Sequence, residues 1–354
     1  MSIFFKNSLS ELAAYVPGEQ PKKEVYIKLN TNESPYPPSK GVFAAAEDEA
    51  KNLRLYSDPD GTALREKIAK HCKVDAENVV LGNGSDEILS FCFQAFEGDF
   101  VFPDITYGFY PVFAKLYGVG FSEIPLDENL FINPKDYMGI NKNIVIANPN
   151  APSGLYMDIE TIEEIVLSNP NNVVIVDEAY IDFGEKSAVC LTKKYDNLVV
   201  VQTFSKSRSL AGARLGFAIS GREIIADLNK IRCSTNPYNV NRITLAAGEA
   251  AMDEQSYYDE NCKKIINTRK WTMDKLEELG FEFPKSSANF VFAKKQGTDG
   301  EFLYEELKKQ KILVRHFKNK RIKDYIRITV GTQKDMESLV EALVKILKTG
   351  DVTK

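Results

Sequence analysis

The chain has 354 residues, of which 44% are hydrophobic and 27% charged, a composition typical of a soluble globular protein with a large core. Its length allows roughly two domains, since a domain usually has about 100 to 200 residues. The 45 lysines and arginines and 50 aspartates and glutamates leave a formal net charge of -5, which argues against nucleic acid as the main partner.

In the centre of the chain, short β-branched runs alternate with longer amphipathic stretches. In chain order, the expected strands are Val79 to Leu81, Phe100 to Phe102, Asn143 to Ala147, Val173 to Asp177, Leu198 to Gln202 and Leu215 to Ile219. Helices are expected between them, for example at Asp86 to Ala95 and Ile159 to Leu167. This alternation predicts an α/β fold, with a mostly parallel sheet between two layers of helices.

The pattern changes after about residue 230. Long charged helices are expected at Tyr257 to Leu279 and Lys334 to Leu347, with short strands at Asn289 to Ala293 and Tyr325 to Thr329. The first 45 residues, with the proline-rich NESPYPP, have too little pattern to fold alone. We therefore predict a large domain at residues 46–250 and a small α+β domain at 1–45 and 251–354.

The cysteines and the apolar segments bear on the compartment. The five cysteines are scattered, odd in number and without a CxxC pair, which argues against a zinc site or a disulfide framework. The N-terminal segment has only a brief apolar patch, and no segment reaches the roughly 20 apolar residues of a membrane span. We therefore expect a cytoplasmic protein that binds neither a metal nor a membrane.

Polar side chains follow four of the expected strands. The segments are LGNGSDE after the first strand, ANPNAPSG after Ile146, DEAY after Val176 and TFSKSRSLAGARLGF after Val201. Because ligands of such sheets bind outside the carboxyl ends of the strands, these loops are expected to converge on one site.

The first of these loops is a candidate anion site. Gly84, Ser85 and Asp86 lead into a helix, whose free N–H groups and dipole attract a phosphate, although a plain strand-to-helix turn would have the same sequence. Hydroxyls and a fixed positive charge for the same anion are available at Thr203, Ser205 and Arg214.

Lys206 and Asp177 are the residues most suggestive of chemistry. A lysine between hydroxyls and near Arg214 should have a lowered pKa, which suits Schiff-base formation, but most loop lysines are simply solvated. An aspartate at the end of a buried strand needs a cation or a donor, and a helix cap or an arginine partner would also satisfy it.

Taken in order, Asn148, Asp177, Tyr180, Lys206 and Arg214 resemble the fold-type-I pyridoxal-phosphate aminotransferases. More narrowly, ten segments follow the order and rough spacing of the histidinol-phosphate aminotransferase family. They are YVPGE, KLNTNESPYPP, YSDPDG, LGNGSDE, DITYGFY, NPNAPSG, VDEAYIDF, TFSKSRSLAGARLGF, ILVR and IRITVGT. The resemblance spans nearly the whole chain.

The resemblance implies roles around the cofactor pyridoxal 5′-phosphate. Lys206 would hold the cofactor covalently and move the substrate proton, and Asp177 would pair with the pyridine nitrogen. Asn148 and Tyr180 would hydrogen-bond the phenolate oxygen of the ring, and Tyr107 would stack on its face. The phosphate would be held by the backbone of Gly84, Ser85 and Asp86 and by Thr203, Ser205 and Arg214.

One loop departs from the family pattern. NPNAPSG has Ala151 and Ser153 where relatives commonly carry a second Asn and a Thr. Both changes lie beyond Asn148, so its contact with the cofactor is expected to persist. Glu178 and Arg208, beside the proposed catalytic residues, have no assigned role.

The resemblance also implies the assembly and the substrate. It predicts a homodimer with shared active sites, in which Tyr15 and Tyr56 complete the partner's pocket and Tyr56 reaches the phosphate of the partner's cofactor. Without the resemblance, Tyr56 would be interpreted as a core or turn aromatic. Arg315 and Arg327 resemble two anion-binding arginines, while Arg315 alone could equally be a surface residue of a strand. The expected polar substrate pocket comprises Tyr15, Asn30, Asn32, Tyr56, Arg315 and Arg327.

The implied reaction is transamination between L-histidinol phosphate and 2-oxoglutarate, giving imidazole acetol phosphate and glutamate in histidine biosynthesis. Aromatic amino-acid aminotransferases and threonine-phosphate decarboxylases share most of these motifs and remain alternatives. A nicotinamide-dependent oxidoreductase would need GxGxxG, whereas GNGSDE lacks the third glycine. A non-catalytic binding protein would have little use for Lys206 together with Asp177.

Overall fold

The structure is a computed structural model that describes residues 2, 4–10, 12–14, 18–21 and 24–350. Within them, a seven-stranded sheet has the order β2-β8-β7-β6-β5-β3-β4. Neighbouring strands from β7 to β4 run parallel, while β8 is antiparallel to both β7 and β2. The strands are β2 (Val79–Gly82), β3 (Phe100–Pro103), β4 (Phe121–Ile124), β5 (Asn143–Ala147), β6 (Val174–Asp177), β7 (Leu198–Thr203) and β8 (Gly216–Ile219).

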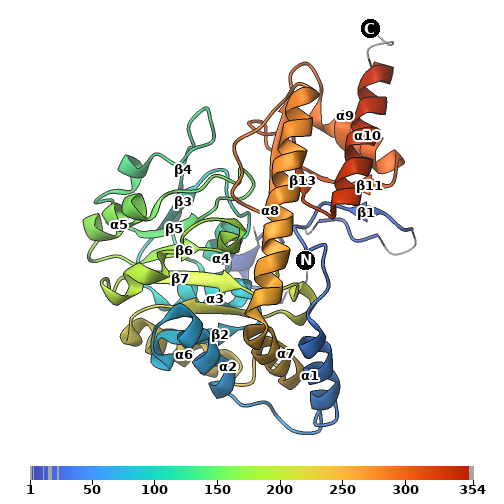
Figure 1. Ribbon diagram of the computed structural model, residues 1–354. Helices are drawn as coiled ribbons and strands as arrows, with labels where there is room; N and C mark the ends of the chain where they lie inside the picture. The colour runs from blue at the N-terminus through green and yellow to red at the C-terminus, as the bar shows by residue number, and fades with distance from the viewer. Residues whose placement is uncertain (1, 3, 11, 15–17, 22–23, 351–354) are drawn as a thin grey trace.

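Helices cover both faces of this sheet (Figure 1). One face packs against α2 (Thr62–Cys72), α5 (Ile159–Ser168) and α7 (Arg242–Asp253), the other against α3 (Ser85–Ala95), α4 (Tyr110–Tyr117) and α6 (Arg222–Thr235). In β5, Ile144 and Ile146 belong to one apolar cluster and Val145 to the other. Side chains alternate along a strand, so a strand covered on both faces must be apolar throughout. The predicted α/β class is confirmed.

A second sheet lies further along the chain and has the order β12-β13-β10-β9. Its antiparallel strands are β12 (Arg315–His316), β13 (Tyr325–Thr329), β10 (Phe290–Lys295) and β9 (Phe281–Glu282). It shares an apolar cluster with α9 (Gly300–Lys309) and α10 (Gln333–Gly350). The long α8 (Gln255–Glu278) runs from the region of α7 to this sheet (Figure 1).

The N-terminal segment contacts both parts. β1 (Ile27–Lys28) pairs in parallel with β11 (Ile312–Leu313), beside the small sheet, whereas α1 (Lys40–Ala50) packs along α7. The domain division at residues 46–250 stays a prediction. Among the described residues, every helix is too short or too polar to cross a bilayer.

Two features of the large sheet were not predicted from the sequence. β4 is an edge strand whose residues are half-buried or exposed, so FSEI lacks an apolar run. The antiparallel direction of β8 has no local signal, because burial on both faces gives the same apolar pattern in either direction. The other expected elements are present. Their bounds differ most at α10, which was expected to end at Leu347 and ends at Gly350.

Candidate active site

The loops that follow β2, β5, β6 and β7 surround one cavity of about 260 Å³. The cavity brings together most of the predicted cofactor residues, which come from separate parts of the chain. Those that line it are Ser85, Asp86, Tyr107, Asp177, Tyr180, Thr203, Ser205, Lys206 and Arg214. The expected convergence of these loops is therefore present in the structure.

Lys206 lies three residues beyond the end of β7 and extends into this cavity. Its Nζ donates to the backbone oxygen of Thr31 at 3.3 Å and lies 5.8 Å from the centre of the Tyr180 ring. Burial lowers the pKa of Lys206 to about 8, and the positive charge of Arg327 contributes further. More of the amine is therefore neutral and nucleophilic near neutral pH than in an exposed lysine.

Asp177 ends β6, with only 5% of the residue exposed. The Tyr110 hydroxyl donates to Oδ2 at 2.8 Å, and the backbone N–H of Ala179 donates to Oδ1 at 3.2 Å. Burial raises the pKa of Asp177 to about 6. A cation in the cavity would favour its ionised form, so the site suits a protonated ring nitrogen. Tyr110 was not predicted to take part, although it ends the quoted segment DITYGFY.

The start of α3 forms a cradle suited to an anion. The helix begins at Ser85, after Gly84 with φ of 82°. A Cβ on Gly216 would lie 2.4 Å from the Ser85 backbone nitrogen, so only glycine fits beneath this amide. The Arg214 guanidinium lies beside Gly84 and donates to Asp86 Oδ2 at 3.0 Å. Helix amides and a guanidinium together suit a phosphate.

Hydroxyls and an aromatic ring complete the first cavity. Thr203 Oγ1 donates to Ser205 Oγ at 3.0 Å, and both residues are buried against the cavity. The Tyr107 hydroxyl donates to Asp86 Oδ1 at 2.8 Å, which fixes the ring on the cavity wall. The cavity thus offers an anion cradle, a buried carboxylate and a flat aromatic ring.

Asn148, which was predicted to contact the cofactor, does not line the first cavity. Its Nδ2 donates to the Met157 backbone oxygen at 2.9 Å, and its Oδ1 accepts from the Met157 N–H at 2.8 Å. Both polar atoms of the amide are therefore occupied, and Asn148 lines a separate hollow of about 220 Å³. Ala151, expected to lie beyond the contact, is the residue of this loop that lines the cavity with Lys206.

A second cavity of about 440 Å³ adjoins the first, and Lys206, Tyr180, Tyr107, Ala151 and Thr31 line both. Predicted substrate residues line the second cavity: Asn30, Asn32, Arg315 and Arg327. The two arginines are partners in the antiparallel register of β12 and β13, which places them on the same face of the small sheet. This half of the site suits an anionic group on an amine substrate.

Tyr56 is 78% exposed, stacks on Tyr238 with ring centres 4.5 Å apart, and lines neither cavity. Tyr15 lies outside the described residues. Glu33 lines the first cavity without having been predicted, and its signal is its place in KLNTNESPYPP. A larger hollow of about 660 Å³ at the N-terminal end of α6 includes none of the predicted residues.

The sequence and the fold of this chain both resemble those of known proteins. Residues 24–343 match the family described as aminotransferase class I and II. A histidinol-phosphate aminotransferase from Brachyspira hyodysenteriae is 48% identical over 98% of this chain and 100% of its own length. One from Acinetobacter baumannii is 46% identical over 96% of each chain. The crystal structure of a Sinorhizobium meliloti histidinol-phosphate aminotransferase in complex with pyridoxal-5'-phosphate has a TM-score of 0.88, with 22% identity and 99% coverage of both chains.

Proposed function

This chain belongs to the class I and II aminotransferase family, and from that premise we propose that it transfers an amino group between L-histidinol phosphate and 2-oxoglutarate with pyridoxal 5′-phosphate as cofactor. The products are imidazole acetol phosphate and glutamate, in a step of histidine biosynthesis. The observation that carries the proposal is the position of Lys206 at the junction of two cavities, one suited to a phosphorylated pyridine and the other lined by two arginines.

The first cavity fits the cofactor in its donors and charges. The amides at the start of α3, together with Thr203, Ser205 and Arg214, would hold the phosphate. Asp177 would face the pyridine nitrogen, with Tyr107 on the ring face and Tyr180 at the ring hydroxyl. When bound, the cofactor withdraws electrons from the carbon that carries the substrate amine, which makes a proton on that carbon acidic.

The residues of the chain control that proton and the charge of the ring. Once displaced by the substrate amine, Lys206 would carry the proton on Nζ between the substrate carbon and the cofactor. Its pKa of about 8 is close to neutral pH, which suits a general base. Asp177 would be ionised beside the pyridine nitrogen and would keep that nitrogen protonated. Tyr110, which donates to Asp177, would hold the carboxylate in place.

The second cavity supports a substrate with an anionic end. Arg327 and Arg315 would bind the phosphate of histidinol phosphate and, in the second half-reaction, a carboxylate of 2-oxoglutarate. Asn30 and Asn32 add polar surface, whereas phenylalanine would need an apolar wall. An aromatic amino-acid aminotransferase or a threonine-phosphate decarboxylase of the same fold is the alternative.

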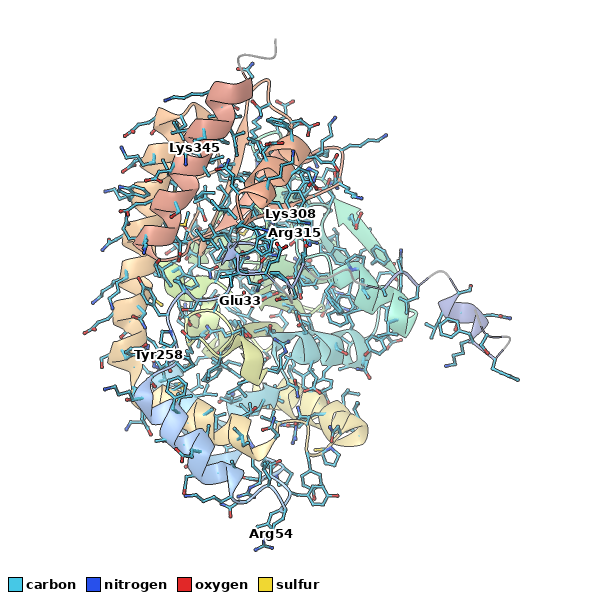
Figure 2. All side chains as sticks on the ribbon, turned by 90° about the vertical axis from the view of Figure 1, so that its right-hand side faces the viewer. Glu33, Arg54, Tyr258, Lys308, Arg315 and Lys345 are labelled. Carbon is cyan, nitrogen blue, oxygen red and sulfur yellow. The ribbon has the colours of Figure 1, made fainter. Side chains whose placement is uncertain are left out.

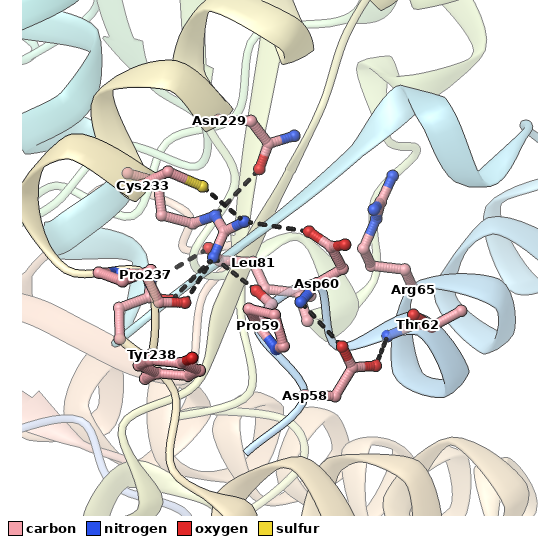
Figure 3. Close-up of polar contacts among 12 residues, drawn as sticks. Asp58, Pro59, Asp60, Thr62, Arg65, Leu81, Asn229, Cys233, Pro237 and Tyr238 are labelled. Carbon is pink, nitrogen blue, oxygen red and sulfur yellow. Dashed lines mark hydrogen bonds and ion pairs between the residues drawn. The ribbon is translucent and has the colours of Figure 1, made fainter. Parts of the chain in front are cut away.

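We also propose a cytoplasmic homodimer with shared active sites. The short helix η1 (Asn7–Leu9) stands away from the body of the chain, and the nearby Phe4 is 89% exposed (Figure 2). The exposed ring of Tyr56 lies on the same loop as Pro59. The Nη1 of Arg232 donates to the backbone oxygens of Pro59 at 2.6 Å and Pro237 at 3.3 Å, which holds this loop in place (Figure 3). A fixed exposed aromatic suits contact with a second copy. The described cysteines are unpaired, as in a reducing compartment.

An amino-transfer assay tests the proposal. Purified protein should form glutamate from histidinol phosphate and 2-oxoglutarate, and parallel reactions should use phenylalanine, tyrosine and threonine phosphate. An order-of-magnitude preference for an aromatic amino acid, or release of carbon dioxide from threonine phosphate, would overturn the substrate while leaving the cofactor. Borohydride reduction and peptide mapping should place the pyridoxyl group on Lys206, and a label on another lysine would overturn the cofactor assignment.

A further inference from the structure

The hydroxyl of Tyr180 is held by a residue from a distant part of the chain. Tyr180 lines both cavities, and its ring packs edge-on against Phe290 with centres 5.1 Å apart. Asn32, in the N-terminal segment, donates its Nδ2 to the Tyr180 hydroxyl oxygen at 3.0 Å. A phenol oxygen that accepts a hydrogen bond keeps its own proton for another partner. Here that proton is available to a ligand in the cavity.

The orientation of the Asn32 amide is determined by its surroundings. Asn32 is 1% exposed and has φ of 56°, a left-handed conformation that asparagine tolerates better than most residues. Its backbone N–H donates to Thr329 Oγ1 at 2.9 Å, so the single proton of that hydroxyl is directed to Asn32 Oδ1, 3.0 Å away. Asn289 Nδ2 donates to the Asn32 backbone oxygen at 3.0 Å. With Oδ1 committed to Thr329, Nδ2 must point at Tyr180.

The loop after β5 adds no second donor at this position. The Asn148 amide bonds the Met157 backbone. The Asn150 amide is also occupied, because Nδ2 donates to the Ile105 oxygen at 3.0 Å and Oδ1 accepts from Thr106 Oγ1 at 2.8 Å. Ala151 lies on the wall of both cavities, where its methyl group offers no hydrogen bond.

We propose that Asn32 is a positioning residue, which aims the Tyr180 proton at the ring hydroxyl of the cofactor. Among the described side chains, Tyr180 alone would make this hydrogen bond, because Ala151 beside it on the cavity wall offers no donor. The inference rests on the cofactor of the proposed function. A hydrogen bond to the ring oxygen stabilises its anionic form and thereby lowers the proton affinity of the neighbouring lysine–cofactor nitrogen. Tyr180 and Asn32 should therefore set the pKa of that nitrogen together.

The visible absorbance of the lysine–cofactor Schiff base, titrated against pH, measures this pKa directly and needs no turnover. The charged groups that face Lys206 and Tyr180 are Arg327, Glu33, Asp86, Arg214 and Asp177, and all of them remain in the variants below.

Tyr180→Phe should raise the pKa of the Schiff base by about one, the equivalent of one hydrogen bond to a charged group. Asn32→Ala should raise it by a smaller amount, and in the Tyr180→Phe background it should have no further effect. Ala151→Asn should lower it by adding a donor. Asn78→Ala is the control, because its Nδ2 donates to the Ser220 backbone oxygen and Asn78 lines neither cavity.

The possible outcomes distinguish failure of the positioning role from failure of the proposed function. A Schiff base that forms normally but has the same pKa in Asn32→Ala overturns the positioning role, as does an Asn32→Ala effect that persists undiminished without the Tyr180 hydroxyl. Absence of any visible lysine adduct in the wild-type protein overturns the proposed function itself. If Asn32→Ala does not fold, Thr329→Val removes the hydroxyl that orients the amide and should raise the pKa in the same direction. An unchanged pKa there also counts against the proposal.

Discussion

Asp177 and Glu178 are adjacent buried carboxylates with different surroundings. Replacing each residue by its amide should therefore distinguish a role in cofactor binding from a role in stability. Their exposed fractions are 5% and 2%. Asp177 lines the first cavity, whereas Glu178 accepts hydrogen bonds from Ser187, Ala188 and Gln202 and lines neither cavity. Burial raises the pKa of Asp177 to about 6 and that of Glu178 to about 7.

In the cofactor-free protein, the folded pKa of each carboxylate lies above its ordinary value of 3.8 or 4.5. Between the two values the folded state keeps a proton that the unfolded chain has released, so the free energy of unfolding falls as pH rises from about 4 to about 7. Ionising Asp177 therefore costs on the order of 3 kcal/mol, at about 1.4 kcal/mol per pKa unit. Asp177→Asn removes this cost but weakens the bond from Tyr110, worth about 1 to 2 kcal/mol.

We therefore expect cofactor-free Asp177→Asn to be more stable than wild type by about 1 to 2 kcal/mol at pH 8, and no more stable at pH 4. Urea unfolding at both pH values measures the difference. With cofactor, the same variant should lose most of its turnover, because an amide cannot hold the pyridine nitrogen protonated.

Glu178→Gln is the matched control for this substitution. Relative to wild type, its free energy of unfolding should also increase as pH rises. Its cofactor affinity and turnover should stay near those of wild type. Near-normal turnover in Asp177→Asn, or an equal loss of cofactor in Glu178→Gln, would refute the division of roles between the two carboxylates.

Three further predictions test the rest of the site. Arg315→Ala and Arg327→Ala should each raise KM for histidinol phosphate by about 10- to 100-fold through loss of charge-assisted hydrogen bonds; unchanged KM values in both would rule out this substrate subsite. Gly216→Ala should weaken pyridoxal phosphate binding in equilibrium dialysis, because its Cβ would lie 2.4 Å from the first amide of α3, whereas Gly212→Ala, with nothing within 4 Å, should not; equal affinities would contradict the cradle. Sedimentation should show a wild-type dimer, and Tyr56→Phe should stay dimeric with weaker cofactor binding; an active monomer would disprove sharing of the sites.

The convergence of the four loops could be predicted because it follows from local sequence patterns alone. Apolar runs mark buried strands, parallel strands end at one edge, and polar residues at those ends must meet there. Asp177 and Lys206 follow this logic, since each lies at or just beyond the end of an apolar strand. Nothing about their separation along the chain had to be known.

The conformation inside a loop could not be predicted in this way. Asn148 and Ala151 are three residues apart, yet they line different hollows, because the Asn148 amide bonds the backbone of Met157. Similarly, the lowered pKa of Lys206 was expected from nearby Arg214, but burial and Arg327 contribute more. Both differences have one cause: the neighbour with the largest effect is set by tertiary contacts and not by distance along the sequence.

β13 explains why the substrate half and the cofactor half of the site depend on each other. Arg327 and Thr329 are two residues apart on this strand, so their side chains project from the same face. Arg327 lines the second cavity, and Thr329 orients Asn32, which in turn holds the Tyr180 hydroxyl. A shift of one residue in the register of β13 against β10 would turn both side chains to the other face. The pairing of β10 with β13 would therefore position both the arginine proposed to bind an anion and the asparagine proposed to aim the Tyr180 proton.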